Sequence, residues 1–154
     1  EFMGRVLVKN EDKGFSGGVR WSHISTVDNI NLLSPFGQVV AEIKSNESAA
    51  LLTTSEQRTY RATNVESLTK KVLGWRLPIL GLQYWVRGVN SPKTKSEIDR
   101  DADGRIIGIR QDGWTIIYTS YFPSQLIKTE RPRVLVLKRS NLKIKLVIDN
   151  WETK

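Results

Sequence analysis

The sequence predicts a mainly β protein of the α+β class: a single curved antiparallel sheet that forms an incomplete barrel, capped by short helices over an apolar cavity. Apolar and polar residues alternate over much of the chain, which is the pattern of half-buried strands. A central stretch changes to helical spacing. The order of strands, two short helices and strands again favours one sheet with helices over its open side.

Six strands are expected before the centre of the chain. Alternating apolar residues, with turn residues between them, place these strands at 4–8, 15–22, 29–33, 39–44, 49–54 and 57–61. Within the second of them, Gly17 and Gly18 predict a bulge or a bend.

Two short helices are expected in the centre. Thr63 and Glu66 have the spacing of a capping box, and Gly74 supplies a C-terminal stop, so the first helix should cover 65–73. The second helix is expected within 77–88, where a proline is allowed in the first turn. It is apolar on most of its circumference, so it should be buried against the sheet or line a cavity.

Four strands are expected after the helices, at 105–110, 114–121, 134–138 and 142–148. Gln111-Asp112-Gly113 is a typical hairpin turn between the first two. In the last strand the even-numbered residues are apolar, and Val147 is the one apolar residue on the other side. One face of the sheet is therefore apolar, and the other mostly meets water.

A short acidic segment has some of the features of a calcium loop. Asp99, Asp101 and Asp103, followed by Gly104, match the start of an EF-hand loop. Arg110 occupies the position of its closing glutamate, and helical patterns are absent on both sides. We therefore interpret Asp101 to Gly104 as a hairpin turn and predict no metal site.

The residue types available limit the chemistry. The chain has no cysteine and one histidine, His23, which excludes thiolate metal sites and argues against a multi-histidine metal centre or a Ser-His-Asp triad. Glu42 and Glu66 are explained by the water face of a strand and by the helix cap. We therefore expect no enzyme activity, no catalytic residue and no cofactor.

The net charge of +8 comes mainly from two basic groups. Such groups attract nucleic acid, an anionic membrane or an acidic protein, and a solvated face that keeps the protein soluble explains them equally well. The first group is Arg58, Arg61, Lys70, Lys71 and Arg76. The second group is Lys128, Arg131, Arg133, Lys138, Arg139, Lys143, Lys145 and Lys154.

The turn between the third and fourth predicted strands carries an unusual residue. Pro35 and Gly37 are turn residues, because proline fixes φ and glycine tolerates positive φ. Phe36 lies between them, and a hairpin tip in water has no folding reason to carry a large ring. The tip is therefore expected to meet something apolar. The alternative is that Phe36 folds back onto the core.

An apolar sheet face beneath an apolar helical cover suits a lipid tail. Each buried methylene of an acyl chain contributes about 0.8 kcal/mol, so such a cavity could hold the chain without any charged contact. The alternative is a filled core. The residues expected to line the acyl-chain cavity are Trp21, Ile30, Leu32, Leu68, Val72, Ile79, Leu82, Trp85, Ile116, Tyr118 and Leu146.

A basic β domain that binds single-stranded nucleic acid is the alternative function. Aromatic and basic residues interleave at Trp75-Arg76 and over 84–87, as they do on stacking platforms for single strands. These aromatics lie within or beside the apolar helical pattern, so lining of the core or of the cavity is the more economical interpretation.

Five segments carry a resemblance that covers nearly the whole chain: 18–21, 32–37, 65–73, 77–88 and 142–151. The most specific parts are the turn of proline, an apolar residue and glycine, and the terminal Asp-Asn-Trp. In these segments the sequence resembles the LolB family of bacterial outer-membrane lipoprotein receptors.

The resemblance implies an incomplete antiparallel barrel capped by helices, with no nucleotide and no metal. It also implies a monomer that receives lipoproteins from a LolA-type periplasmic carrier and releases them into outer-membrane phospholipid, without binding nucleic acid. The family needs a protruding loop with an apolar tip, which falls on Pro35, Phe36 and Gly37; other members carry leucine where Phe36 stands. The basic groups would favour an acidic carrier or anionic lipid.

The resemblance further implies a native form on the periplasmic face of the outer membrane, anchored by lipid on an N-terminal cysteine. This chain lacks that cysteine and the helix that usually precedes the first strand, and we expect it to be soluble. Glu1-Phe2-Met3 is interpreted as a cloning remnant, so 4–154 is expected to be a single lipoprotein-receptor-like domain.

Overall fold

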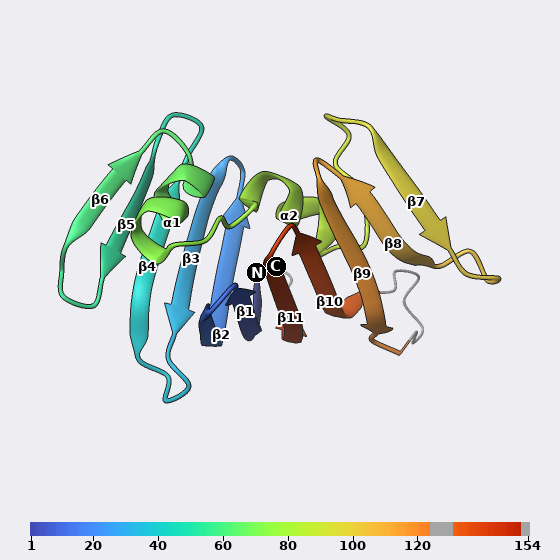
Figure 1. Ribbon diagram of the computed structural model, residues 1–154, viewed down its shortest axis with the longest axis horizontal. Helices are drawn as coiled ribbons and strands as arrows, with labels where there is room; N and C mark the ends of the chain where they lie inside the picture. Colours follow the sequence, from blue (N-terminus) through green and yellow to red (C-terminus); the bar gives the residue numbers. More distant parts are fainter. Residues whose placement is uncertain (124–130, 152–154) are drawn as a thin grey trace. The chain divides into compact units, whose positions relative to one another are not determined.

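The computed structural model describes residues 1–123 and 131–151. Within these residues most of the chain is strand, and the two helices are short (Figure 1). The helices are α1 (Val65–Leu73) and α2 (Ile79–Trp85). The strands are β1 (Phe2–Asn10), β2 (Lys13–Ile24), β3 (Val27–Leu33), β4 (Val39–Ser45), β5 (Ala50–Thr54), β6 (Thr59–Ala62), β7 (Ser96–Arg100), β8 (Ile106–Gln111), β9 (Trp114–Tyr121), β10 (Pro132–Arg139) and β11 (Leu142–Trp151).

The strands form one antiparallel sheet that is not closed. Its hydrogen-bonded order is β6-β5-β4-β3-β2-β1-β11-β10-β9-β8-β7, so β6 and β7 are its two edges. Every neighbouring pair is consecutive along the chain except β1 and β11. The predicted single sheet that stops short of a complete barrel is confirmed.

The chain folds into two compact units. The described part of the first unit is 1–6, 15–79 and 149–151, and that of the second is 7–14, 80–123 and 131–148. Strands β1, β2 and β11 contribute residues to both units, as does helix α2. The expected single domain over 4–154 remains a prediction.

The first unit is built around β2 to β6, whose register lines up apolar side chains on one face. Trp21 pairs with Ile30, Ile30 with Ile43, and Ile43 with Leu52, so one row of buried side chains crosses four strands. Helix α1 lies against β5 and β6 (Figure 1) and buries Val65 and Leu68. The alternation of apolar and polar residues that predicted these strands thus corresponds to side chains that point alternately to the buried face and to the open face of the sheet.

The start of β1 belongs to the same unit. Phe2 and Met3, which were interpreted as part of a cloning remnant, begin this strand. The Phe2 ring is 3% exposed and packs edge-on against Trp21, with 5.6 Å between ring centroids. It also lies 5.3 Å from the ring of Trp151. The apolar face therefore continues to the first residues of the chain.

Helix α1 has the predicted limits but a different N-cap. The Asn64 side chain accepts a hydrogen bond from the Ser67 backbone N–H over 2.8 Å, so Asn64 is the cap. The predicted capping box on Thr63 and Glu66 is wrong, because it begins one residue too early. Asparagine caps about as well as any residue, which explains why it takes the position. Gly74 ends the helix in a left-handed conformation, as predicted.

The second unit contains β7 to β10, most of β11 and the hairpins between them. The hairpin predicted around Gln111-Asp112-Gly113 is confirmed, but Gln111 is the last residue of β8, so the turn to β9 has two residues, Asp112 and Gly113, both with positive φ. The predicted turn at Asp101 is also confirmed: its carboxylate accepts hydrogen bonds from the backbone N–H groups of Asp103 and Arg105. The strand that precedes this turn, β7, was not predicted, because its sequence Ser-Glu-Ile-Asp-Arg contains a single apolar residue.

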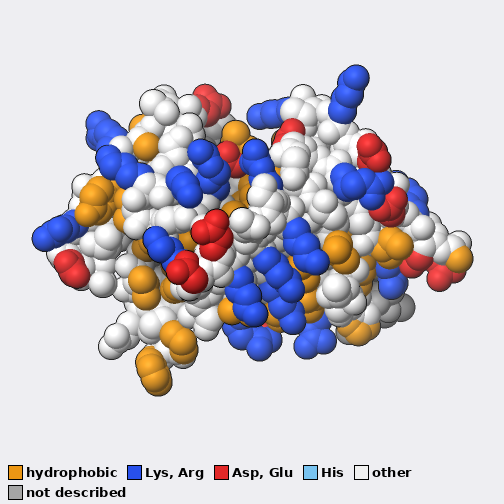
Figure 2. Space-filling view, viewed as in Figure 1, with side chains coloured by type: hydrophobic (Ala, Val, Ile, Leu, Met, Phe, Trp, Pro, Cys, Tyr) orange, Lys and Arg blue, Asp and Glu red, His pale blue; other side chains and the backbone are white. Residues whose placement is uncertain are grey.

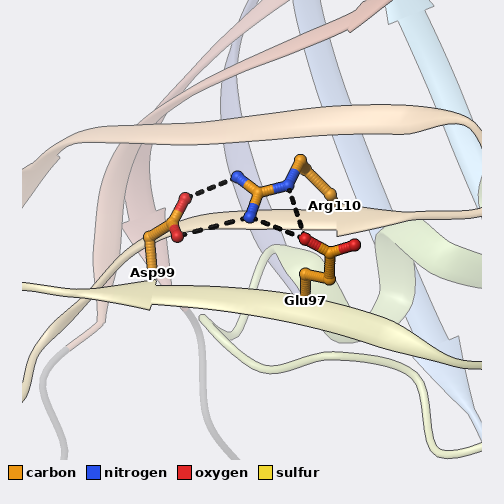
Figure 3. Close-up of polar contacts among 3 residues, drawn as sticks. All are labelled: Glu97, Asp99 and Arg110. Carbon is orange, nitrogen blue, oxygen red and sulfur yellow. Dashed lines mark hydrogen bonds and ion pairs between the residues drawn. The ribbon is translucent and has the colours of Figure 1, made fainter.

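An arginine holds the edge strand β7 to β8. The Arg110 guanidinium donates to Asp99 over 2.7 Å and to Glu97 over 3.0 Å (Figure 3). Arg110 stands directly opposite Glu97 in the register, and Asp99 is two residues further along β7. These two carboxylates raise the pKa of the Arg110 guanidinium, mainly through the hydrogen bonds to Asp99 and Glu97. These exposed ion pairs add to the backbone pairing of β7 with β8.

The faces of β11 agree with the prediction. Ile144, Leu146 and Ile148 are buried, whereas Lys143 and Lys145 are exposed. Val147, the apolar residue on the outer side, is half-buried.

The cap of α1 gives a direct test. We expect Asn64→Ala to lower the free energy of unfolding by about 1 kcal/mol, because the Ser67 N–H loses its acceptor. Thr63→Ala should change it by less than about 0.5 kcal/mol, because Thr63 is exposed and does not cap the helix. Urea unfolding followed by circular dichroism measures both. A larger loss for Thr63→Ala than for Asn64→Ala would contradict the assignment.

Candidate functional site

The β3–β4 connection presents an aromatic ring to solvent. The Phe36 side chain is 92% exposed, which is the highest value among the large apolar residues that the structure describes. The predicted exposure of Phe36 is therefore confirmed, and the alternative of a ring folded onto the core is wrong. In Figure 2 apolar side chains project at the lower left, where Figure 1 places this connection.

Hydrogen bonds fix the backbone of this tip. The Ser34 carbonyl accepts from the Gly37 N–H over 2.9 Å, and the Ser34 N–H donates to the Gln38 carbonyl over 2.7 Å. The Ser34 hydroxyl accepts from the Phe36 and Gln38 N–H groups, each over 3.2 Å. Pro35 therefore occupies the second position of the turn, where its fixed φ is favourable. Little freedom remains in the backbone that carries the ring.

Glycine is required at the end of the turn for its conformation and not for its size. Gly37 has a φ of +87°, in the left-handed region, and an added Cβ would meet no atom within 4 Å. The surroundings of the tip are apolar as well. Residues 32–41 contain no charged side chain, and Val39 is 48% exposed. An uncharged, rigid, apolar tip is suited to an apolar medium.

In the first unit, six of the residues predicted to line an acyl-chain cavity are found on the apolar side. Trp21, Ile30 and Leu32 come from β2 and β3 and are at most 5% exposed. The remaining three lie on the helices: Leu68 and Val72 on α1, and Ile79 as the first residue of α2. Leu68 and Ile79 are buried, and Val72 on α1 is half-buried.

A buried carboxylate holds the indole of Trp21. The Asp28 side chain accepts a hydrogen bond from the Trp21 Nε1–H over 2.8 Å, and its same oxygen lies 2.7 Å from His23 Nδ1. The single histidine thus has a structural role beside Asp28. With its N–H satisfied, Trp21 offers only apolar surface to its other neighbours.

In the second unit, the other five predicted residues are all buried. Tyr118 and Leu146 both pair with Leu135 across β9, β10 and β11, so they lie on one face. Ile116 lies on the same side of β9 as Tyr118 and has no exposed surface. The two from helix α2, Leu82 and Trp85, are 4% and 1% exposed.

Buried hydrogen bonds anchor α2 within the second unit. The Trp85 Nε1–H donates to the Gln111 side-chain oxygen over 2.9 Å, and the Tyr118 hydroxyl donates to the Trp85 carbonyl. Gln111 also accepts from the Ser91 N–H and donates to the carbonyls of Ser91 and Thr94. One side chain therefore ties α2 and the loop after it to β8.

The environment of Tyr118 changes its acidity. Burial raises the pKa of the Tyr118 phenol well above its usual range, and the neighbouring Tyr121 adds to the increase. The hydroxyl therefore stays protonated and keeps donating to the Trp85 carbonyl up to strongly alkaline pH.

A close approach also fixes the indole of Trp85. An added Cβ at Gly81, one turn earlier in α2, would lie 2.4 Å from the ring. Any larger residue at position 81 would therefore displace Trp85.

Sequence reasoning missed three residues of this arrangement. Ser34 is typical of the first position of a turn, so a signal for it existed. Gln111 was interpreted only as part of a hairpin connection, and nothing in its local sequence indicates a buried amide. Gly81 stands in an apolar helical pattern that gives no sign of an indole against it.

The interleaved aromatic and basic residues do not form a stacking platform. Trp75 is 6% exposed and Trp85 is 1% exposed, so their faces are covered. The interpretation of Trp75 and Trp85 as buried apolar residues is confirmed, whereas Tyr84 is half-buried and has the Arg87 guanidinium 5.4 Å from its ring centre.

Two further features bear on the type of site. Among the described residues, no three His, Cys, Asp or Glu side chains are grouped so that they could hold a metal ion. Neither helix of the described chain has the length and apolar character needed to cross a membrane. Of the predicted basic groups, Lys128 and Lys154 lie outside the described residues.

Comparison with known proteins gives a consistent result. A family model described as outer membrane lipoprotein LolB matches residues 1–151. The outer-membrane lipoprotein LolB of Nitrosomonas europaea is 45% identical over 149 residues, which are 97% of this chain and 70% of that protein. The protein of the same name from Thiobacillus denitrificans is 39% identical over 98% of this chain and 78% of its own length. The protein of the same name from Pseudomonas aeruginosa strain PAO1 is 34% identical over 98% of this chain and 73% of its own length.

The buried phenol predicts how stability depends on pH. Tyrosine in an unfolded chain ionises near pH 10, whereas folded Tyr118 does not, so ionisation favours unfolding as the pH rises above about 10. We expect Tyr118→Phe to lower the free energy of unfolding by about 1 kcal/mol at pH 7, because the Trp85 carbonyl loses its donor. The free energy of unfolding of the Tyr118→Phe variant should then fall less steeply than that of the wild type between about pH 9 and 11. Urea unfolding at several pH values measures this, and equal slopes would contradict the prediction.

Proposed function

We propose, because this chain belongs to the outer-membrane lipoprotein LolB family, that its buried apolar faces take up the acyl chains of a lipoprotein and that the Phe36 tip enters the membrane that receives it. Membership of the family gives the broad function: the protein is a receptor in lipoprotein localisation at the outer membrane, and not an enzyme. It also places the protein in the LolA pathway. Within that function, the buried apolar faces bind the acyl chains and the Phe36 tip contacts the membrane.

The exposed ring of Phe36 carries the proposal for the membrane end. A phenyl ring in water on a tip without charges gains free energy when it enters an apolar phase, at about 25 cal/mol per Å² of apolar area. The four hydrogen bonds around Ser34 mean that little conformational entropy is lost when the tip inserts. The tip thus acts as a small preformed wedge.

The acyl-chain end of the proposal rests on the apolar side chains. Trp21, Trp85 and Tyr118 have their polar atoms occupied, so the faces to which they belong are apolar. An acyl chain that replaces side-chain contacts there gains about 0.8 kcal/mol for each methylene removed from water. Because most of these residues are covered, the chain enters by displacing neighbours. Entry beside Val72 on α1, which is only half-buried, requires the least displacement.

The finer partner assignments belong to the same proposal. A LolA-type periplasmic carrier delivers the lipoprotein, and phospholipid of the outer membrane accepts it. One monomer handles one lipoprotein. The alternative of a single-stranded nucleic-acid-binding domain is not favoured, because the match to the LolB family spans residues 1–151 and the rings of Trp75 and Trp85 are buried.

The tip gives the first test. We expect Phe36→Glu to reduce the delivery of lipoprotein to liposomes at least tenfold while the circular dichroism spectrum and acyl-chain binding stay unchanged, because a charged tip does not enter an apolar phase. Phe36→Leu should retain most of the rate. Val27→Glu is a matched control at the opposite end of β3, where Val27 is 51% exposed. Delivery by Phe36→Glu at the wild-type rate would overturn the role of the tip.

The apolar face gives the second test. We expect Val72→Glu to weaken binding of a fluorescent fatty acid at least tenfold, because the new carboxylate must be desolvated beside the acyl chain. Ser67→Glu makes the same change of charge on the exposed side of α1 and should leave binding unaltered. Native mass spectrometry with palmitate counts bound chains. Unchanged binding by Val72→Glu would show that acyl chains do not enter beside α1.

A further inference from the structure

The outward side of the second unit carries an unusual mixture of side chains. On this side of the sheet Lys138 stands directly opposite Lys143, and Lys145 is the next outward residue of β11. Several neighbouring outward positions are apolar, although Thr115 stands opposite Lys138 and Ser120 opposite Val134 on β9. We call this surface the outer lysine face, and it consists of Ile117, Val134, Val136, Lys138, Lys143, Lys145 and Val147.

The register places these residues in adjacent rows. One row runs from Ile117 through Val136 to Lys145, and the next pairs Val134 with Val147. Ile117 is 37% exposed, and the three valines are half-buried. Four β-branched side chains thus meet solvent beside three lysines. In Figure 2 Lys and Arg side chains gather in the lower middle, where Figure 1 places β10 and β11.

The outward residues of β1 continue the pattern. β1 follows β11 in the strand order, and the part of β1 within this unit carries Leu7 and Lys9. Leu7 is 40% exposed, and Lys9 is exposed as well. Apolar and basic side chains therefore alternate over three neighbouring strands.

Folding alone does not explain this surface. Like charges directly opposite each other in a sheet are destabilising. No ion pair to Lys138, Lys143 or Lys145 is formed within the described residues, 1–123 and 131–151. Ile117 and the three half-buried valines beside them expose apolar surface to solvent. A surface that lowers stability and is uncompensated inside the chain indicates an external anionic partner.

The acidic side chains near this face do not neutralise it. Glu97 and Asp99 on β7 form ion pairs with Arg110 on β8. Asp149 forms an ion pair with Arg5 over 2.8 Å. The other acidic side chains of the described part of this unit lie on turns: Glu11, Asp12, Asp101, Asp103 and Asp112; among them Glu11 accepts a hydrogen bond from the Asn141 side chain over 3.3 Å.

We propose that the outer lysine face is a second membrane-contacting surface, which binds the anionic headgroups of a lipid bilayer. Lysines reach phosphates with their ammonium groups, while their methylene stems and the β-branched side chains lie against the headgroup boundary. A nucleic acid would satisfy the charges but would leave Ile117 and the three valines without an apolar partner. The mixture of both chemistries favours the bilayer surface. This inference does not rest on Phe36 or on the acyl-chain sites.

The test uses the whole chain with Phe36→Glu, so that insertion of the tip does not contribute. We expect this protein to bind vesicles of equal parts phosphatidylcholine and phosphatidylglycerol, to bind phosphatidylcholine vesicles much less, and to lose binding at high salt. Adding Lys138→Gln, Lys143→Gln and Lys145→Gln should weaken binding to the anionic vesicles about 100-fold, because each lysine near an anionic surface contributes about a factor of five. Vesicle co-sedimentation measures the affinity.

A matched control removes the same charge elsewhere. Lys71→Gln, Lys93→Gln and Lys95→Gln replace three exposed lysines that do not belong to this face and should weaken binding by less than about fivefold. Ile117→Ser should weaken vesicle binding but leave the binding of a soluble oligonucleotide unchanged. The proposal is overturned if the Phe36→Glu protein does not bind anionic vesicles, if both triple variants lose binding equally, or if the oligonucleotide is bound more tightly than the vesicles.

Discussion

The antiparallel register is the constraint on which the rest of the structure depends. Because side chains alternate between faces, a slip of one residue in β3 would turn Ile30 and Leu32 towards solvent and bring Asn29 and Asn31 into the core. The same alternation places the lysines and valines of β10 and β11 together on the outside. Both the apolar faces and the outer lysine face are consequences of one pairing pattern.

The proposed function needs one rigid part, the Phe36 tip, and one adaptable part, the buried apolar faces. The tip is held by backbone hydrogen bonds through Ser34, so Phe36 is presented without any rearrangement. The apolar faces are made of packed side chains, which must separate when a ligand enters. Gln111 limits that separation in the second unit, because it anchors Trp85 of α2 and the backbone around Ser91 to β8.

Periodicity predicted most of the fold because it reports directly on which face is covered. It located ten of the strands and the helix over 65–73, and it singled out Phe36, since a ring between Pro35 and Gly37 contradicts the usual polarity of a turn. It missed β7, whose one apolar residue gives no alternation; β7 pairs with β8 along its length, and Arg110 adds exposed ion pairs to Glu97 and Asp99. The Gln111 network also lay beyond prediction, because hydrogen bonds between distant segments leave no local pattern.

The ion pairs on β7 have a consequence for behaviour in a crowded compartment. An open sheet offers its outermost strand as a template on which another extended chain can grow, and repeated addition would lead to polymerisation. On β7 both carboxylates are engaged by Arg110, and the strand contains one apolar residue, so a newcomer would gain little from side-chain contacts and would have to disturb the charges. The edge strand β7 thereby disfavours the addition of a strand from another chain.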